Sequence, residues 1–351
     1  MRFLLKAVTV LAVVMASGLA GANSSATLDK SKAKTAAPKA ASHAQKTVAA
    51  KPVKQSTVVA RKAHASAQLA AGKARGLQSA DTWREAQKLA LYSASALVLD
   101  QRVGDPLFQK NADVVAPIAS ITKLMTAMVV LDSQPNLQGP VAISEEDVDT
   151  LRGSRSRLHV GSVLSRETAL LLALMSSENR AAHALARHYP GGLSAFIAAM
   201  NAKAQSLGMT HTRFEDPTGL SSNNVSTAHD LARMVTAAHH YPLIREWSTT
   251  SEAVVEVSGR EQTFRNTNPL VKSPAWDVGL SKTGYIHEAG KCLVMQARVA
   301  EKPVVIVLLD SAGKMTRVGD ANRIKRWMES AQASHKSQTH AAVRGDGKGP
   351  G

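Results

Sequence analysis

Ser120 and Lys123 are the two residues whose types and spacing are best suited to covalent chemistry. They precede an apolar segment, Leu124 to Leu131, which contains no Gly or Pro and is predicted to be helical. Because positions i and i+3 lie on one face of a helix, the hydroxyl and the amine would face each other. A helix N-terminus also offers free backbone N–H groups that stabilise developing negative charge. The pair is therefore a candidate nucleophile and base.

The Ser-x-x-Lys spacing alone is a weak signal. It also occurs at Ser31–Lys34, in a polar low-complexity tract, and at Ser311–Lys314, in a predicted loop. Two further motifs follow Ser120 along the chain. These are Ser177-Glu178-Asn179, at a predicted junction between helices, and Lys282-Thr283-Gly284, the only Lys-Thr-Gly of the chain. The three motifs in this order separate Ser120 from the other two serines.

The elements that must position these motifs lie between residues 89 and 330. Runs typical of strands stand near both ends of this region, at residues 95–100, 107–110, 253–257, 279–285, 292–300 and 303–310. Helical spacing dominates the middle, at residues 124–131, 167–176, 180–188, 193–207 and 227–239, and returns at 317–330. We therefore predict an α+β fold, in which one antiparallel sheet lobe packs with helices against an all-helical lobe and the active site lies in the cleft between them.

The two ends of the chain differ from this region. Residues 1–22 contain basic residues, then an apolar run from Ala7 to Val14, then Ala20-Gly21-Ala22, as a cleaved signal peptide does. We expect export, for example to the periplasm, with no stable membrane insertion after cleavage. An N-terminal membrane anchor is the alternative, but the apolar run is short for a span of about 20 residues. Residues 331–351 are polar and are predicted to be disordered.

The formal net charge of +16 is concentrated in residues 23–80. This Ala-rich tract holds eleven basic residues and one acidic residue, which leaves only +4 for residues 81–351 once the leader is set aside. Its composition cannot bury enough apolar surface to fold, so we predict a disordered arm. It could bind anionic envelope polymers or act only as a solvated tether. Nucleic acid is discounted as a partner because the leader predicts export.

Redox and metal chemistry receive no support from the sequence. Cys292 is the only one of its type, which excludes an intramolecular disulfide, and its apolar neighbours predict an inert buried thiol. The histidines show no pairing that suggests a metal site. We therefore predict neither a metal nor a cofactor.

The three motifs together resemble the set found in penicillin-binding proteins and class A β-lactamases. The chain resembles the low-molecular-mass serine D,D-peptidases, the D-alanyl-D-alanine endopeptidase and carboxypeptidase family, and in particular the penicillin-binding protein 7 type. Two further segments of the sequence, Asp216–Leu220 and Ser226–Ala232, are also similar to this family. The resemblance covers about residues 90–330 and implies the β-lactamase and penicillin-binding fold. It also implies peptidoglycan muropeptides as substrates and β-lactams as covalent inhibitors.

The resemblance assigns catalytic roles to three side chains. Ser120 would attack the carbonyl between two D-residues and form an acyl-enzyme. Lys123 would take the serine proton, with a pKa lowered by burial and by the charge of Lys282. Ser177 would relay a proton to the leaving amine.

Further residues would bind the substrate. By the same resemblance, Asn179 would hydrogen-bond a backbone amide of the substrate, and Lys282 with Thr283 would hold a carboxylate. Gly284 would let the substrate approach the strand edge. The backbone N–H groups of Tyr285 and of the nucleophile would form the oxyanion hole.

Four functions remain open within these expectations. We favour an endopeptidase that cuts peptide cross-links, because no second β-domain or amphipathic anchor is visible beyond Trp327. A carboxypeptidase that trims pentapeptide stems is the first alternative. A β-lactamase would need a deacylating Glu, and no Glu-x-x-Asn follows the second motif, since Glu215 precedes Asp216-Pro217-Thr218. A non-hydrolytic β-lactam sensor or wall anchor is the alternative from a different class.

Overall fold

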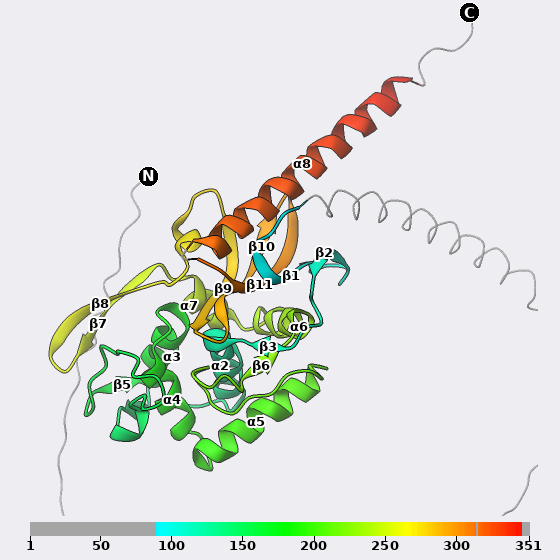
Figure 1. Cartoon of the computed structure of the whole chain (residues 1–351). Helices are drawn as coiled ribbons and strands as arrows, with labels where there is room; N and C mark the ends of the chain where they lie inside the picture. Colours follow the sequence, from blue (N-terminus) through cyan, green and yellow to red (C-terminus); the bar gives the residue numbers. More distant parts are fainter. Residues whose placement is uncertain (1–88, 314, 346–351) are drawn as a thin grey trace, which may run out of the picture. The chain divides into compact units, whose positions relative to one another are not determined.

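A five-stranded antiparallel sheet forms the centre of the described structure (Figure 1). The computed structural model describes residues 89–313 and 315–345. The strand order is β2-β1-β11-β10-β9, so that β9 is an edge strand. The bounds are β1 Ser93–Asp100, β2 Pro106–Lys110, β9 Asp277–Ile286, β10 Gly290–Val299 and β11 Lys302–Ser311. The first strand thus pairs with the last, at registers such as Leu97 opposite Val307, within the single antiparallel sheet that the sequence predicts.

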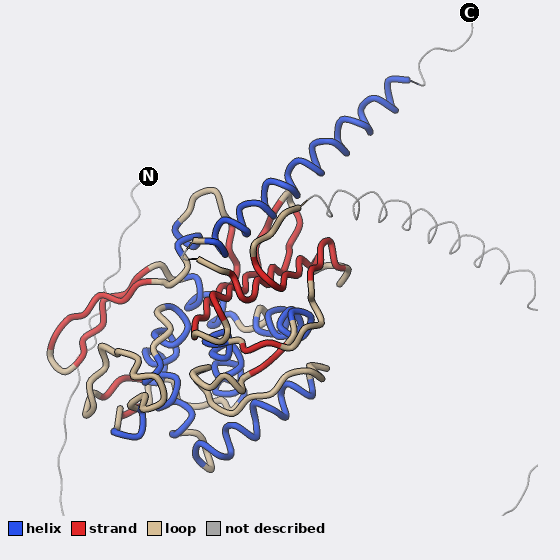
Figure 2. The backbone as a smooth tube through the Cα atoms, in the orientation of Figure 1, coloured by secondary structure: helices blue, strands red, loops and turns tan. Residues whose placement is uncertain are grey.

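The apolar run of β11 is continuous because both faces of the sheet are covered. Val305, Val307 and Leu309 belong to the core on the helical side. Val304, Ile306 and Leu308 belong to a second core on the opposite side. Ile324 and Met328 of α8 (Thr316–Gly345) pack into that second core. The chain trace in Figure 2 shows the strands between α8 on one side and the remaining helices on the other.

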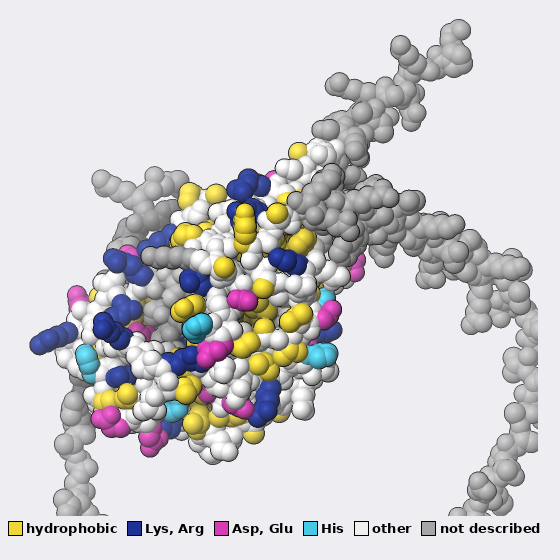
Figure 3. Space-filling model, viewed as in Figure 1, with side chains coloured by type: hydrophobic (Ala, Val, Ile, Leu, Met, Phe, Trp, Pro, Cys, Tyr) yellow, Lys and Arg dark blue, Asp and Glu magenta, His cyan; other side chains and the backbone are white. Residues whose placement is uncertain are grey.

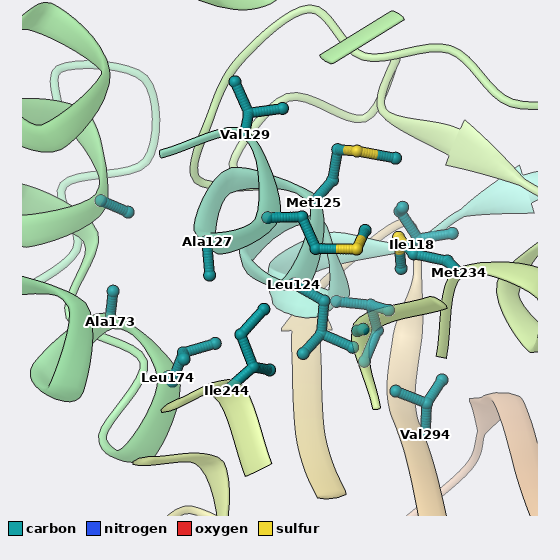
Figure 4. Packing of buried hydrophobic residues seen from close by; sticks show 14 of the residues in the cluster. Ile118, Leu124, Met125, Ala127, Val129, Ala173, Leu174, Met234, Ile244 and Val294 are labelled. Atoms are coloured by element: carbon teal, nitrogen blue, oxygen red, sulfur yellow. The ribbon is translucent and has the colours of Figure 1, made fainter. Parts of the chain in front are cut away.

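The helical lobe is built around α2 (Thr122–Asp132). Nine of its eleven residues are buried, and a helix that is apolar on all sides belongs in the centre of a core. Figure 4 shows Leu124 and Ala127 among side chains of α3, α6, α7 and β10. The bounds of the surrounding helices are α3 Arg166–Met175, α4 Asn179–Arg187, α5 Gly192–Ser206, α6 Ala228–Ala238 and α7 Pro242–Thr249. Lys123, which stands in the first turn of α2, is therefore buried by the helices around it.

Short elements complete the described residues. Three two-stranded sheets pair β3 (Ala116–Pro117) with β6 (Val225–Ser226), β4 (Pro140–Ala142) with β5 (Val163–Ser165), and β7 (Glu252–Val257) with β8 (Arg260–Arg265). Three 3₁₀ turns are η1 Ala119–Ile121, η2 Glu145–Asp147 and η3 Pro269–Lys272. The first of these contains Ser120, so the predicted helix is preceded by a 3₁₀ turn at the nucleophile.

The α+β architecture agrees with the sequence prediction, but individual elements differ. Helix α7, strand β8 and the short paired strands β3 with β6 and β4 with β5 were not predicted from the sequence. Helix α8 continues to Gly345, so the prediction of disorder from residue 331 is wrong for 331–345. Residues 331–345 contain Ala and other residues compatible with a helix, and no Pro occurs between Ser330 and Pro350, which explains why the helix does not end at Ser330. No helix among the described residues is long and apolar enough to span a membrane.

Candidate active site

The nucleophile turn places Ser120 directly against Lys123. Ser120 is in η1, and side chains at i and i+3 eclipse each other in a 3₁₀ turn. Lys123 Nζ lies 2.9 Å from Ser120 Oγ. Ala119, just before the serine, has a φ of 48°, a left-handed conformation that costs free energy for a non-Gly residue and clusters at functional sites. The local prediction of a paired hydroxyl and amine therefore matches the observed geometry.

Lys123 is fully buried and contacts two other segments. Its Nζ lies 2.7 Å from Asn179 Oδ1 and 2.7 Å from the carbonyl oxygen of Thr218. Burial lowers the pKa of Lys123 from its ordinary value to about 7, although the carboxylates of Asp216 and Glu178 act in the opposite direction. The predicted contribution of Lys282 to this lowering is wrong, because burial alone lowers the pKa of Lys123. A lysine with this pKa is partly neutral near pH 7 and can accept a proton.

Ser177 and Asn179 stand at the junction between α3 and α4. Ser177 has a φ of 63°, again left-handed, and its Oγ accepts a hydrogen bond of 2.9 Å from Lys282 Nζ. Asn179 begins α4 and donates from Nδ2 to Ser154 Oγ, 2.9 Å away. Ser177 is thus linked to the strand lobe, whereas Asn179 is linked to the base.

Lys282 to Tyr285 occupy the edge strand β9 beside the nucleophile turn. Lys282 is only 1% exposed. Burial, followed by the charges of Lys123 and Arg317, holds its pKa well below the ordinary value. Thr283 Oγ1 donates to Thr267 Oγ1 at 2.6 Å. Tyr285 is 60% exposed, whereas Ile286 is buried again, so the side chain of Tyr285 alone faces solvent after the Lys-Thr-Gly motif. All eight predicted site residues thus lie on the three segments that meet here.

Gly284 has a reason in the structure that the sequence did not provide. A Cβ at this position would lie 2.9 Å from the carbonyl oxygen of Ile118 and 3.1 Å from the backbone nitrogen of Ser120. The missing side chain lets β9 approach the nucleophile turn itself. That Gly284 also lets the substrate approach the strand edge stays a prediction.

A Gly284→Ala variant tests this close approach. We expect acylation of Ser120 by penicillin to slow by about tenfold to a hundredfold, because a shift of about 1 Å in a reacting group can have an effect of that size. The measurement is the rate of adduct formation by mass spectrometry. Gly259→Ala is the control, since a Cβ there would meet nothing within 4 Å, although the φ of Gly259, unlike that of Gly284, is positive. Equal rates in Gly284→Ala and wild type would contradict the role.

The turn at Asp216–Leu220 contributes contacts that the sequence analysis did not assign. Asp216 Oδ1 accepts hydrogen bonds from the backbone N–H groups of Thr218 and Gly219, at 2.5 and 2.7 Å. This bonding fixes the Thr218 carbonyl at Lys123. A Cβ on Gly219 would lie 1.9 Å from the carbonyl oxygen of Ala119, so this turn also packs directly on the nucleophile turn. The similarity of Asp216–Leu220 to the family was the only signal in the sequence.

Arg317 is a second residue that the sequence analysis missed. It comes from α8, and its Nη1 donates to the carbonyl oxygens of Gly284 and Cys292, at 3.0 and 3.1 Å. Burial lowers its pKa below the ordinary value, which does not discharge a guanidinium. The guanidinium adds a fixed positive charge beside Lys282. No motif marks Arg317 in the sequence, because only the packing of α8 brings it to β9.

These contacts combine a hydroxyl, a partly neutral buried amine and a cluster of cationic groups at an edge strand. Such a site suits acyl transfer to a serine from a substrate that carries a carboxylate.

The comparisons with known proteins agree with this chemistry. The sequence profile of the D-alanyl-D-alanine carboxypeptidase family, the S11 peptidases, matches residues 82–313. The chain belongs to this family.

Individual members of the family are similar over most of their length. The D-alanyl-D-alanine endopeptidase of Pseudomonas aeruginosa is 53% identical, over 70% of this chain and 79% of that protein. The D-alanyl-D-alanine endopeptidase of Escherichia coli is 47% identical, over 73% of this chain and 86% of that protein. The crystal structure of the Streptomyces K15 DD-transpeptidase superposes with a TM-score of 0.64 at 29% identity, covering 68% of this chain and 97% of that one.

Family membership and fold class are therefore confirmed. The chain is a serine-type D,D-peptidase with the penicillin-binding fold that the three motifs predicted. The roles of the individual site residues remain predictions, which the contacts above support.

Proposed function

We propose that this protein cleaves the peptide cross-links of peptidoglycan as a D-alanyl-D-alanine endopeptidase, through an acyl-enzyme on Ser120. The observation that carries the mechanism is the contact of 2.9 Å between Ser120 Oγ and the buried Lys123 Nζ. Neutral Lys123 takes the proton of Ser120, whose oxygen bonds to the carbonyl carbon between two D-residues. The carbon–nitrogen bond then breaks, and the amine leaves with a proton. Water then attacks the acyl-enzyme, the ester bond to Ser120 breaks, and Lys123 returns its proton to the serine oxygen, while the protons of the water go to the donor of the leaving amine and to the solvent.

The proposed proton route to the leaving amine does not pass through the contact between Ser120 and Lys123. Ser177 Oγ bonds Lys282 Nζ rather than Lys123, so a relay through Ser177 draws on the Lys282 side of the site. Lys282 with Thr283, assisted by the charge of Arg317, would hold a substrate carboxylate. Asn179 already bonds Lys123 and Ser154. It therefore positions the base in addition to its proposed contact with a substrate amide.

The nucleophile turn and β9 also supply an oxyanion site. Backbone N–H groups of Ser120 and Tyr285 are the proposed donors, and the close packing permitted by Gly284 brings their two segments together. Donors held before the reaction stabilise the tetrahedral oxyanion without having to reorganise.

Endopeptidase activity is favoured over carboxypeptidase activity by the relatives. The two proteins with about half of their residues identical are both named endopeptidases. A carboxypeptidase of Bacillus subtilis, DacF, is 27% identical. The carboxypeptidase alternative shares every catalytic step, so only the choice of substrate separates the two.

The test is incubation of the purified protein with a cross-linked muropeptide dimer and with a monomeric pentapeptide, followed by mass analysis of the products. We expect monomers from the dimer and little loss of D-alanine from the pentapeptide. The reverse pattern would establish the carboxypeptidase. Acylation by penicillin without turnover of either substrate would establish a non-hydrolytic binder, and prior acylation serves as the inhibited control.

Export and the role of the basic arm are part of the same proposal. The predicted signal peptide, 1–22, and arm, 23–80, lie outside the described residues. A wall substrate requires an exported enzyme, which fits the leader. On the face shown in Figure 3, basic and acidic side chains of the described part are interspersed. Because the formal positive charge is concentrated in residues 23–80, we assign any contact with anionic envelope polymers to the arm rather than to the peptidase domain.

A further inference from the structure

An ion pair crosses between two loops beside the active site. Arg152 lies in the loop between η2 and β5, and Glu288 lies in the turn between β9 and β10. Their contact is bidentate, with Nη2 to Oε1 at 3.0 Å and Nη1 to Oε2 at 2.9 Å. The two side chains are 23% and 47% exposed. None of the three catalytic motifs contains either residue.

Both loops are attached to the catalytic residues. Arg152 Nε donates to the carbonyl oxygen of Leu220 at 2.5 Å, and Leu220 follows the glycine that packs on the nucleophile turn. Two residues beyond Arg152, Ser154 bonds Asn179. On the other side, Glu288 follows Tyr285 by three residues. The ion pair therefore joins the two flanks of the nucleophile.

The packing of β9 decides which way a bound peptide runs. Helix α7 packs against β9, and the backbone N–H of Ser281 donates to Ser248 Oγ on that helix. Lys282 and Thr283 are buried, whereas Tyr285 is exposed. A peptide that lies along this strand edge with its reacting carbonyl at Ser120 can thus continue only past Tyr285. That direction leads to Glu288 and Arg152.

We propose that Arg152 and Glu288 form a specificity site for a substrate side chain that ends in an α-amino acid group, as diaminopimelate does. This inference rests on the proposed function. The ammonium of such a group would bind Glu288 and its carboxylate would bind Arg152, so each charge exchanges one partner for another. The bond from Arg152 to Leu220 holds the guanidinium in place when the pair opens.

The pairing of opposite charges makes the site selective. A partly exposed ion pair contributes little to stability, so its opening presents a small barrier to a ligand that replaces both partners. A lysine side chain offers only an ammonium and would leave Arg152 without its carboxylate. Leaving one member of a charge pair without its partner costs free energy, so binding of the lysine side chain is disfavoured. We therefore expect a preference for the diaminopimelyl side chain of about tenfold in kcat/KM, equivalent to about 1.4 kcal/mol.

The experiment compares two cross-linked muropeptide dimers that differ only in the residue preceding the D-alanine of the scissile bond, meso-diaminopimelate or lysine. Both are measured with full-length wild type, Arg152→Gln, Glu288→Gln and the control Arg265→Ala. Arg265 forms a similar exposed ion pair, with Glu252 on the β7–β8 hairpin. Cleavage of the cross-link and release of a terminal D-alanine are both counted as activity. Penicillin acylation and the melting temperature are recorded for every variant.

The expected result is a preference of about tenfold in wild type and Arg265→Ala that falls towards unity in Arg152→Gln and Glu288→Gln. The rate of acylation by penicillin, which lacks this side chain, should remain within about threefold of the wild-type rate in every variant, since Arg152 and Glu288 are not part of the Ser120–Lys123 pair. No preference in wild type, or an unchanged preference in the two variants, would overturn the proposal. Failure of wild type to be acylated would instead refute the proposed function.

Discussion

Ser120→Ala is expected to abolish the covalent penicillin adduct that the wild-type protein forms. The substitution removes the one hydroxyl that contacts the buried base, while Lys123 keeps its bonds to Asn179 and Thr218. Non-covalent binding can persist because Lys282 of β9 and Arg317 of α8 remain. The measurement is the intact mass of the mature protein after exposure to penicillin. Hydrolysis of muropeptide dimers should fall by at least about 10⁴-fold, as in other nucleophile knockouts.

Ser31→Ala is the matched control for this experiment. Ser31 and Lys34 reproduce the spacing of Ser120 and Lys123 in a polar tract, so the comparison separates the motif from its structural setting. The control should acquire one penicillin, as the wild type does. An adduct that survives in Ser120→Ala would move the nucleophile to another residue and undo the mechanism.

Local periodicity predicted the part of the site that is local in sequence. Ser120 and Lys123 are three residues apart, and an apolar segment after them is enough to predict their contact. The order of strands and helices likewise gave the α+β fold, because β1 and β11 are strongly apolar. Periodicity did not predict helix α7 (Pro242–Thr249) or strand β8 (Arg260–Arg265), because both segments are short and mix polar with apolar residues.

Contacts between distant segments could not be predicted in the same way. Lys282 bonds Ser177 across 105 positions of sequence, and the resemblance to the family named both residues without showing this bond. Arg317 reaches β9 only through the packing of α8. The proximity of Gly284 to Ser120 depends on how closely an edge strand approaches a turn. These features follow from tertiary packing, which a single sequence does not specify residue by residue.

The burial of Lys123 predicts how the reaction depends on pH. Since its pKa is lowered to about 7, the neutral form that accepts a proton predominates above that value and disappears below it. The rate of penicillin acylation should therefore rise through about pH 7 and level off, and it should fall about tenfold per pH unit on the acidic side. The pKa of Lys282 is also held well below its ordinary value, so the charge proposed to bind a carboxylate is lost at a lower pH than that of an ordinary lysine, and we expect binding to weaken as the pH rises.

Lys123→Met should slow acylation by about 10³-fold and remove the rise near pH 7, because general base catalysis contributes about 10²- to 10⁴-fold. Methionine has a similar length and tolerates burial, so the variant keeps the core of α2 filled. The control is Lys203→Met, which removes a lysine of the same lobe that pairs with Asp132 at 2.9 Å. That variant should retain the wild-type rate and pH profile. Melting temperatures establish that both variants fold. A wild-type profile that is flat between pH 5 and pH 9, or a Lys123→Met variant that keeps the rise, would show that another group accepts the proton of Ser120.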